Sequence, residues 1–243
     1  MKQLFLFFIL ALFLPAHGVT IEKNGRFFKA VNIHSFSDTT DASNAATLLA
    51  AADRDLVLIP VKNPSNPVFS IKNPSFLQQN RKIKLTIDGK LLYGKILSLN
   101  QGFFEINVPF DRGHSETAVF DMEKNCIAGL LSHFTTYKNG RRFFAVRLDN
   151  LNNTAFEWIS AHELLDDLNF FNEVKKEEAH AVYALFSKHN EKDLQAALRK
   201  NMSAKKSHRK WKSTYLKNET EKSQNNIKQI YRRFLNEKIA GKK

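Results

Sequence analysis

The feature that most constrains the fold is a series of short β-type segments between residues 19 and 160. Segments such as RFFKAVNIH, DLVLIPVK, KIKLTID, GFFEINV and RRFFAVRL are rich in β-branched and aromatic residues, and clusters of Asn, Asp, Gly and Pro separate them. Asp88-Gly89 predicts a hairpin, because this pair supplies the positive φ angles of a type I′ turn. Many short strands at this spacing are typical of a β-sandwich or barrel. We therefore expect a mainly β domain over residues 19–160.

From Ser160 onward the pattern becomes helical. Ser160 and Glu163 form a capping box in front of an apolar run. Near the C-terminus, the apolar side chains recur at intervals of three and four residues, at Ile227, Ile230, Tyr231 and Phe234. The nearly all-polar stretch 203–224 is expected to be exposed. Residues 161–243 are therefore predicted to form a basic α-helical C-terminal extension.

The positive charge is concentrated in this extension. The formal net charge is +13, and residues 175–243 hold 19 Lys and Arg against seven Asp and Glu. Cations mixed with aromatic residues suit polyanion binding by charge and stacking. The alternative is a helical face that lysines merely keep solvated. The candidate polyanion-binding residues are Lys205, Lys206, Arg209, Lys210, Trp211 and Lys212.

Residues 1–18 have the pattern of a secretory signal peptide: one Lys, an apolar run over residues 4–14, and Ala16-His17-Gly18. The apolar run is about 11 residues, whereas spanning a bilayer takes roughly 20. The alternatives are a buried first helix or an uncleaved anchor. We expect an exported, periplasmic or extracellular protein of bacterial type, with no transmembrane segment after cleavage. Such a protein would meet an anionic envelope polymer or lipid more readily than nucleic acid.

The stretch DRGHSETAVFDMEKNCIAGLLS, residues 111–132, raises the question of whether Ser115 is a nucleophile. A hydroxyl attacks well only when an imidazole takes its proton and a carboxylate orients that imidazole. Between the expected signal peptide and Asp55, His34 is the one histidine. The single cysteine, Cys126, lies in an apolar run and reads as a buried small hydrophobic residue that can form no intramolecular disulfide.

DRDLVLIPVK followed by GHSETAVFDMEKNCIAGLLS resembles the bacterial trypsin-like (chymotrypsin-fold) serine peptidases. The resemblance implies a reduced trypsin-like β-barrel domain with His34 as general base, Asp55 as its orienting carboxylate and Ser115 as nucleophile. It also implies an oxyanion hole formed by the N–H groups of Gly113 and Ser115. The implied substrate or ligand is a peptide or protein.

The chain departs from the family pattern beside Ser115, and a second register is open. Glu116 and Thr117 stand where the family has two glycines, so side chains and a negative charge are expected beside the developing oxyanion. In a second register, VTIEKNGRFFKAV (residues 19–31) resembles the hairpin that follows the catalytic histidine, and the histidine strand is then missing.

Several interpretations stay open at this point. The chain is an active serine endopeptidase, a degenerate pseudoenzyme of the same fold, or an unrelated β-barrel in which Ser115 merely starts a strand. The alternative class is a non-enzymatic secreted or envelope binding protein that uses its basic tail. No cofactor and no metal site is expected: His180 and His189 are nine residues apart, which excludes a helical i, i+4 ligand pair between them.

Overall fold

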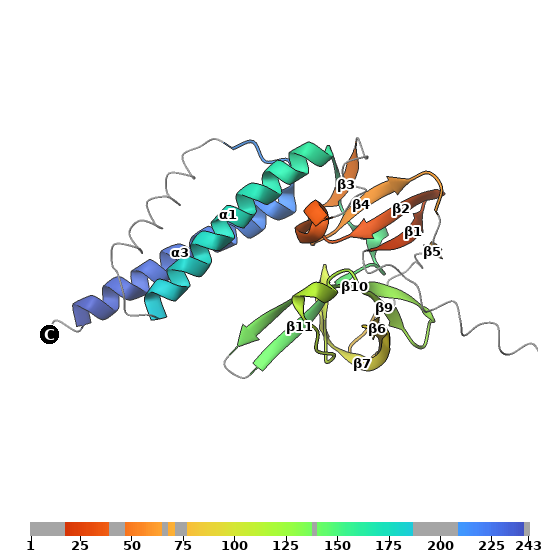
Figure 1. Cartoon of the computed structure of the whole chain (residues 1–243), viewed down its shortest axis with the longest axis horizontal. Coiled ribbons are helices and arrows are strands. Elements are labelled where there is room, and N and C mark those ends of the chain that lie inside the picture. Colours follow the sequence, from red (N-terminus) through yellow and green to blue (C-terminus); the bar gives the residue numbers. More distant parts are fainter. Residues whose placement is uncertain are drawn as a thin grey trace, which may run out of the picture. The chain divides into compact units, whose positions relative to one another are not determined.

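The computed structural model describes residues 18–38, 47–64, 68–70, 77–137, 140–186 and 209–240. The chain divides into two compact units, Met1–Ala161 and His162–Lys243. Strands build the first unit and helices build the second (Figure 1). The expectation of a mainly β chain with a helical C-terminal extension is confirmed.

Half of the strands in the first unit form a six-stranded sheet with the order β12-β3-β4-β2-β1-β5. Its neighbouring strands are antiparallel except for the parallel β1–β5 pair. The strands are β1 (Val19–Lys23), β2 (Arg26–Val31), β3 (Leu48–Ala51), β4 (Val57–Val61), β5 (Val68–Ser70) and β12 (Phe156–Ile159).

The other six strands close into an antiparallel barrel with the order β10-β11-β8-β7-β6-β9, drawn in yellow and green in Figure 1. The strands are β6 (Lys82–Ile87), β7 (Lys90–Leu99), β8 (Phe103–Ile106), β9 (Ala118–Asp121), β10 (Cys126–Tyr137) and β11 (Gly140–Arg147). In the described connections of this unit lie three short 3-10 helices: η1 (Ile33–Asp38), η3 (Arg112–His114) and η4 (Leu151–Asn153).

The β6–β7 hairpin shows how the sequence sets local structure. Ile83, Leu85 and Ile87 alternate with less buried residues and point into the barrel, as expected for a strand with one face in a core. The turn residues Asp88 and Gly89 have φ angles of 49° and 74°, so the predicted positive-φ turn is confirmed.

Among the described residues, two hydrophobic clusters hold the first unit together. One fills the barrel and includes Ile83, Leu85 and Phe104. The other joins the six-stranded sheet to the barrel, since Ile21 and Leu58 of the sheet belong to the same cluster as residues of β9, β10 and β11. Full burial of each large aliphatic side chain contributes about 1.5–3 kcal/mol, so this shared core fixes the sheet against the barrel.

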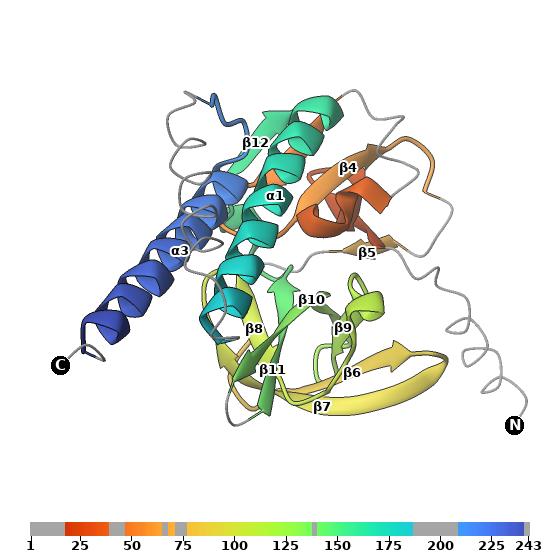
Figure 2. The same ribbon diagram turned by 60° about the vertical axis from the view of Figure 1, so that its left-hand side comes forward.

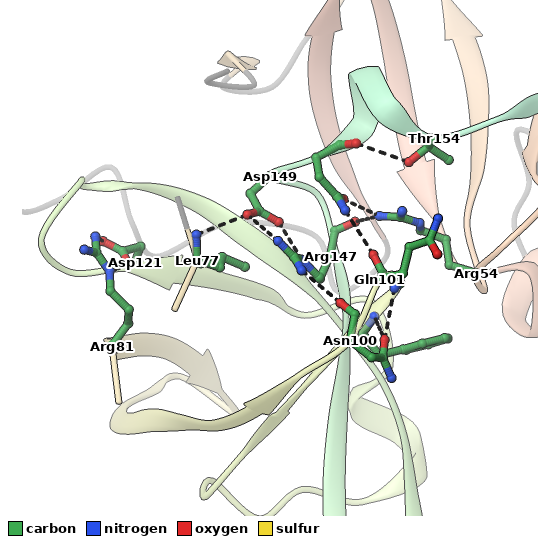
Figure 3. A network of polar contacts seen from close by, with 12 residues as sticks. Arg54, Leu77, Arg81, Asn100, Gln101, Asp121, Arg147, Asp149 and Thr154 are labelled. Carbon is green, nitrogen blue, oxygen red and sulfur yellow. Dashed lines mark hydrogen bonds and ion pairs between the residues drawn. The ribbon is translucent and has the colours of Figure 1, made fainter. Parts of the chain in front are cut away.

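A buried arginine adds a polar connection between the sheet and the barrel (Figure 3). Arg54 lies in the β3–β4 loop next to Asp55 and is 1% exposed. Its guanidinium donates two hydrogen bonds to the Asp53 carboxylate, each 2.8 Å long. It also donates to the Arg147 carbonyl at 3.0 Å and to Asn150 Oδ1 at 2.6 Å, at the end of the barrel strand β11.

The barrel side of this connection is itself held in place. The Arg147 side chain forms a two-armed pair with Asp149, and Asp149 accepts a hydrogen bond from the Leu77 backbone N–H (Figure 3). A Cβ atom on Gly102 would lie 2.9 Å from Arg54 Cβ, so this position admits only glycine without a shift of the backbone. The loop that carries Asp55 is therefore fixed to the barrel by both hydrogen bonds and close packing.

In the second unit, α1 (Ala161–Phe186) and α3 (Thr214–Ala240) lie side by side in both views (Figure 1, Figure 2). The helices run parallel, since Asp167 contacts the segment before α3 while Glu178 bonds Asn226 further along. The predicted apolar stripe is confirmed: buried Ile227 packs with Ala181 of α1, and the rest of the stripe surrounds them.

The expectation that residues 203–224 are exposed is wrong for part of the stretch. Ser213, Leu216, Thr220 and Ser223 are all buried. They recur at intervals of three and four residues and continue the stripe toward Ile227. A run that reads as polar therefore still has one buried face, because serine and threonine are small and Thr220 satisfies its hydroxyl by donating to the Leu216 carbonyl at 2.7 Å.

The start of α3 is held by a buried carboxylate on α1. Asp167 is 2% exposed and accepts hydrogen bonds from the backbone N–H groups of Lys212 and Ser213, each at 2.9 Å, and from Arg209 at 3.0 Å. A carboxylate with three donors is well satisfied, and its negative charge suits the positive end of a helix.

Arg54→Ala is expected to lower the free energy of unfolding of the first unit by about 3 kcal/mol, because it removes one partner of a largely buried ion pair. Hydrogen-exchange mass spectrometry in urea, read on peptides from β2, β4 and β10, measures this unit separately. Arg141→Ala is the matched control, since the Arg141 side chain is 51% exposed and should change stability by less than about 0.5 kcal/mol. Equal effects of the two substitutions would contradict the proposed connection.

Asp167→Ala is expected to destabilise the helical unit by about 3 kcal/mol, because it leaves the half-buried Arg209 and two backbone donors without their acceptor. Trp211 fluorescence during urea unfolding, in a Trp158→Phe background, reports on this unit. The neighbouring Asp166→Ala serves as the control, because the Asp166 side chain is 60% exposed and lies 3.8 Å from His162. Loss of stability in both variants alike would show that Asp167 has no special role.

Candidate functional site

Three separate segments of the first unit bring the predicted triad residues together. His34 lies in η1, directly after the β1–β2 hairpin, and Asp55 lies in the β3–β4 loop. Ser115 follows η3 and precedes β9. His34 is 21 residues from Asp55 and 81 residues from Ser115 in the chain. The hairpin of residues 19–31 precedes His34, whose ring reaches the Asp55 carboxylate.

The histidine and the aspartate are joined twice. His34 Nδ1 lies 2.5 Å from Asp55 Oδ2, and the His34 backbone N–H donates to Asp55 Oδ1 at 3.1 Å. The short contact assigns the ring proton to Nδ1, because a carboxylate can only accept. The other ring nitrogen, Nε2, is then an acceptor that faces the serine.

The serine hydroxyl lies within reach of two acceptors. Ser115 Oγ is 3.3 Å from His34 Nε2 and donates to the Ser132 carbonyl at 3.0 Å. The hydroxyl carries one hydrogen and rotates freely, so it can turn from the carbonyl to the imidazole. The distance to Nε2 is slightly longer than a tight hydrogen bond, as is common for catalytic groups before substrate binds.

Ser132 supports the site from the barrel side. Its hydroxyl donates to Asp55 Oδ2 at 2.9 Å, while its carbonyl accepts from Ser115. Sequence reasoning did not assign Ser132 a role, although it ends the apolar run CIAGLLS. A serine at the buried end of a strand is the signal that could have singled it out, because a buried hydroxyl needs a partner.

The Asp55 carboxyl stays ionised although it is buried. Burial alone raises its pKa, but the charge of His34 and the hydrogen bonds from His34 and Ser132 outweigh burial, so the Asp55 pKa lies below its ordinary value. A negative Asp55 can hold the Nδ1 proton and stabilise the imidazolium that forms when His34 accepts a second proton.

Glu116, expected to place a charge beside the oxyanion, is turned into the protein. It is 2% exposed, and its Oε1 accepts from the Asn32 backbone N–H at 3.2 Å. Its φ angle of 71° is one that glycine adopts more easily, so the backbone makes the glycine-type turn despite the side chain. Burial raises the pKa of Glu116 to about 7, against the lowering effects of the Asn32 hydrogen bond and of the charges of His34 and Lys29.

The two residues predicted to form the oxyanion hole lie at the same turn. Gly113 belongs to η3, and Ser115 follows that helix by one residue. A Cβ atom on Gly113 would meet no atom within 4 Å, so the space beside its Cα is open. The oxyanion role of these two N–H groups stays a prediction.

The six residues predicted to bind polyanions lie in the second unit. Lys205 and Lys206 fall outside the described residues, and Lys210 is exposed. Arg209 pairs with Asp167 at 3.0 Å, and Lys212 pairs with Glu163 at 2.8 Å.

Trp211 is engaged in the same way as these two cations. Its ring packs edge-on against Phe170 of α1, and the Arg209 guanidinium lies over both rings, at 4.8 Å from Phe170 and 5.1 Å from Trp211. Three of the six residues therefore already contact α1.

The described residues hold no group of three or more His, Cys, Asp or Glu side chains that could bind a metal ion. Within the same ranges, no helix is long and apolar enough to cross a membrane. Residues 1–17, most of the predicted signal peptide, lie outside the described part of the chain.

No protein-family model and no curated protein sequence matches the chain. Among solved structures, a variant of the tobacco etch virus protease is 15% identical over 58% of this chain and 79% of its own, with a TM-score of 0.36. The tobacco vein mottling virus protease is 10% identical over 53% of this chain and 74% of its own, with a TM-score of 0.37. The catalytically active tobacco etch virus protease with bound product is 15% identical over 59% and 79%, with a TM-score of 0.36. These similarities are to viral proteases and give no support to the bacterial family suggested by the sequence.

Proposed function

We propose that this chain is an active serine peptidase of trypsin-like architecture. Ser115 is the nucleophile, His34 the general base and Asp55 the carboxylate that orients it. The observation that supports the proposal is the continuous line of contacts from Asp55 Oδ2 to His34 Nδ1, at 2.5 Å, and from His34 Nε2 to Ser115 Oγ, at 3.3 Å. The three side chains come from three separate loops, and each ring nitrogen of His34 faces the partner that a catalytic triad requires.

The proposed reaction follows from these positions. Ser115 Oγ attacks the carbonyl carbon of a peptide bond while its proton passes to His34 Nε2. Asp55 holds the Nδ1–H throughout and stabilises the imidazolium. His34 then gives the proton to the leaving amine. A water molecule, deprotonated by the same imidazole, attacks the acyl carbon, and His34 returns that proton to Ser115 Oγ as the bond between Oγ and the acyl group breaks. The N–H groups of Gly113 and Ser115 are proposed to stabilise the oxyanion, a contribution of about 3 kcal/mol for each such donor.

The strand β10 offers a place for an extended peptide. β9 pairs with β10 only as far as Leu130, whereas β11 pairs with it from Gly129 to Tyr137. Among the described strands, the outer half of β10 therefore has β11 alone as its ladder partner. This half begins at Ser132, whose carbonyl contacts the Ser115 hydroxyl, so a peptide added as a strand there would run past the nucleophile.

Export and polyanion binding stay predictions. The export proposal depends on residues 1–18, with cleavage at Gly18. The alternative function, a binding protein that uses its basic tail, loses some support because Arg209 and Lys212 already pair with carboxylates of α1. Pairing with carboxylates reduces the positive charge that remains for a polyanion.

An aryl phosphonate probe tests the nucleophile. The full chain is expected to be labelled stoichiometrically at Ser115, and the Ser115→Ala and His34→Ala variants are expected to lose labelling by a factor of at least 1,000, on the order of the effect of triad removal in other enzymes. Intact-mass and peptide mass spectrometry measure the extent and site. Ser98→Ala, on the barrel strand β7, is the matched control and should label normally. A folded wild-type chain that takes up no probe would refute the active-peptidase proposal.

Ser132→Ala tests the support of Asp55. The substitution removes one charge-assisted hydrogen bond of about 1.5–3 kcal/mol but keeps the backbone carbonyl that contacts Ser115. The labelling rate is expected to fall about tenfold or more while the labelled residue stays Ser115. Ser132→Thr, which keeps the hydroxyl, should recover part of the rate. An unchanged rate in Ser132→Ala would mean that this hydroxyl does not assist the triad.

A further inference from the structure

Glu116 is a buried titratable group that the proposed reaction does not use. It follows the nucleophile directly, is 2% exposed and has the left-handed φ angle of 71°. Its backbone N–H donates to the Leu131 carbonyl at 2.8 Å, next to Ser132 on β10. The side chain is therefore enclosed on the protein side of the turn that presents Ser115.

Glu116 contacts the segment that leads to the catalytic histidine. Its Oε1 accepts from the Asn32 backbone N–H at 3.2 Å, and Asn32 lies two residues before His34. The Asn32 side chain donates through Nδ2 to the same Leu131 carbonyl, at 2.7 Å. Glu116, Asn32 and Leu131 thus join the nucleophile turn, the histidine segment and the barrel strand β10.

Among the residues that the structure describes, two buried atoms of this join have no hydrogen-bond partner: Glu116 Oε2 and Asn32 Oδ1. Both are acceptors when Glu116 is ionised, so neither can satisfy the other. When Glu116 is protonated at Oε2, that atom becomes a donor. Asn32 Oδ1 is then the acceptor that still lacks a hydrogen bond. A buried acceptor without a hydrogen bond lowers the stability of the fold. When Glu116 is ionised, these contacts lack the one proton that would satisfy both atoms.

The charges around Glu116 come from three elements. Lys29 of β2 and His34 of η1 favour the ionised form, whereas Asp55 of the β3–β4 loop opposes it. Burial raises the pKa of Glu116 by more than Lys29, His34 and the Asn32 hydrogen bond lower it. Glu116 can therefore take up the missing proton near neutral pH.

We propose that Glu116 is a positioning residue that, while protonated, donates from Oε2 to Asn32 Oδ1 and so fastens the nucleophile turn to the histidine segment. Ionisation of Glu116 breaks this hydrogen bond and loosens the alignment of Ser115 with His34. The effect on catalysis rests on the proposed peptidase function, whereas the effect on stability does not.

The sign of the pH dependence follows from linkage. The folded-state pKa of Glu116, about 7, lies above the ordinary glutamate value of 4.5, so the folded protein binds the proton more tightly than the unfolded chain. The stability that this group contributes is fully present below pH 4.5. It is lost as the pH rises through about 7.

Glu116→Gln is the decisive variant, because an amide accepts through Oε1 and donates through Nε2 at every pH. The melting temperature of the full wild-type chain is expected to fall relative to that of Glu116→Gln as the pH rises from 5 to 8.5, and the two should converge at pH 5. Glu22→Gln, an exposed carboxyl on β1, is the matched control and should follow the wild type. A constant difference between wild type and Glu116→Gln across this range would overturn the proposal.

A second measurement needs no variant and applies even if Glu116→Gln does not fold. Carbon-13 NMR of the side-chain carboxyl groups in the wild-type chain should show one glutamate with a midpoint near pH 7. If every glutamate titrates below pH 5.5, Glu116 holds no proton near neutral pH and the proposal fails.

The phosphonate labelling rate separates this proposal from the peptidase proposal. Between pH 6 and 8.5, the wild-type rate should fall at least threefold relative to the rate of Glu116→Gln. Labelling with the same pH profile in both proteins overturns the positioning role and leaves the peptidase standing. A melting-temperature difference without any labelling leaves the protonated join standing and refutes the peptidase.

Discussion

The geometry of the site depends on the buried contact between Arg54 and the end of the barrel. The guanidinium is held by Asp53 in its own loop and reaches the Arg147 carbonyl and Asn150 Oδ1 across the boundary between the two sheets. Asp55 is the next residue in the chain, so the connection that fixes Arg54 also fixes the carboxylate of the candidate triad. Removal of an ion this deeply buried from its partners is costly, which makes the loop position rigid.

The hydrophobic core that the sheet and the barrel share also fixes the two parts of the site relative to each other. Ile21 and Leu58 of the six-stranded sheet pack in one cluster with Leu130 and Val146 of the barrel. His34 and Asp55 lie in segments that connect strands of the six-stranded sheet, whereas Ser115 and Ser132 belong to the barrel. Neither sheet holds the candidate site by itself. Burial between them aligns a hydroxyl with an imidazole at hydrogen-bonding distance, and hydrogen bonds from both sides keep the Asp55 carboxylate ionised in a buried position.

In the helical unit, the polarity of the sequence did not predict correctly which residues are buried. The polar stretch before Ile227 suggested exposure, yet Ser213 and Thr220 are buried because small hydroxyl side chains can bond within their own helix or cap it. Arg209 of the same stretch, a candidate polyanion-binding residue, pairs with Asp167, and polyanion binding stays a prediction. Composition gives the charge of a segment, whereas the partner of each charge depends on which helix lies beside it.

The sequence by itself determined the β and helical halves, the Asp88-Gly89 turn, the apolar stripe of α3 and the three residues to compare at the site. Each of these depends on local chemistry: side-chain periodicity, positive-φ turns, or the types of residue that a nucleophile needs. Only the tertiary structure decided that His34, Asp55 and Ser115 meet, that Ser132 and Arg54 support them, and that Glu116 turns inward to Asn32. These contacts join residues from 17 to 96 positions apart, and no local pattern encodes which distant partner a buried polar group will meet.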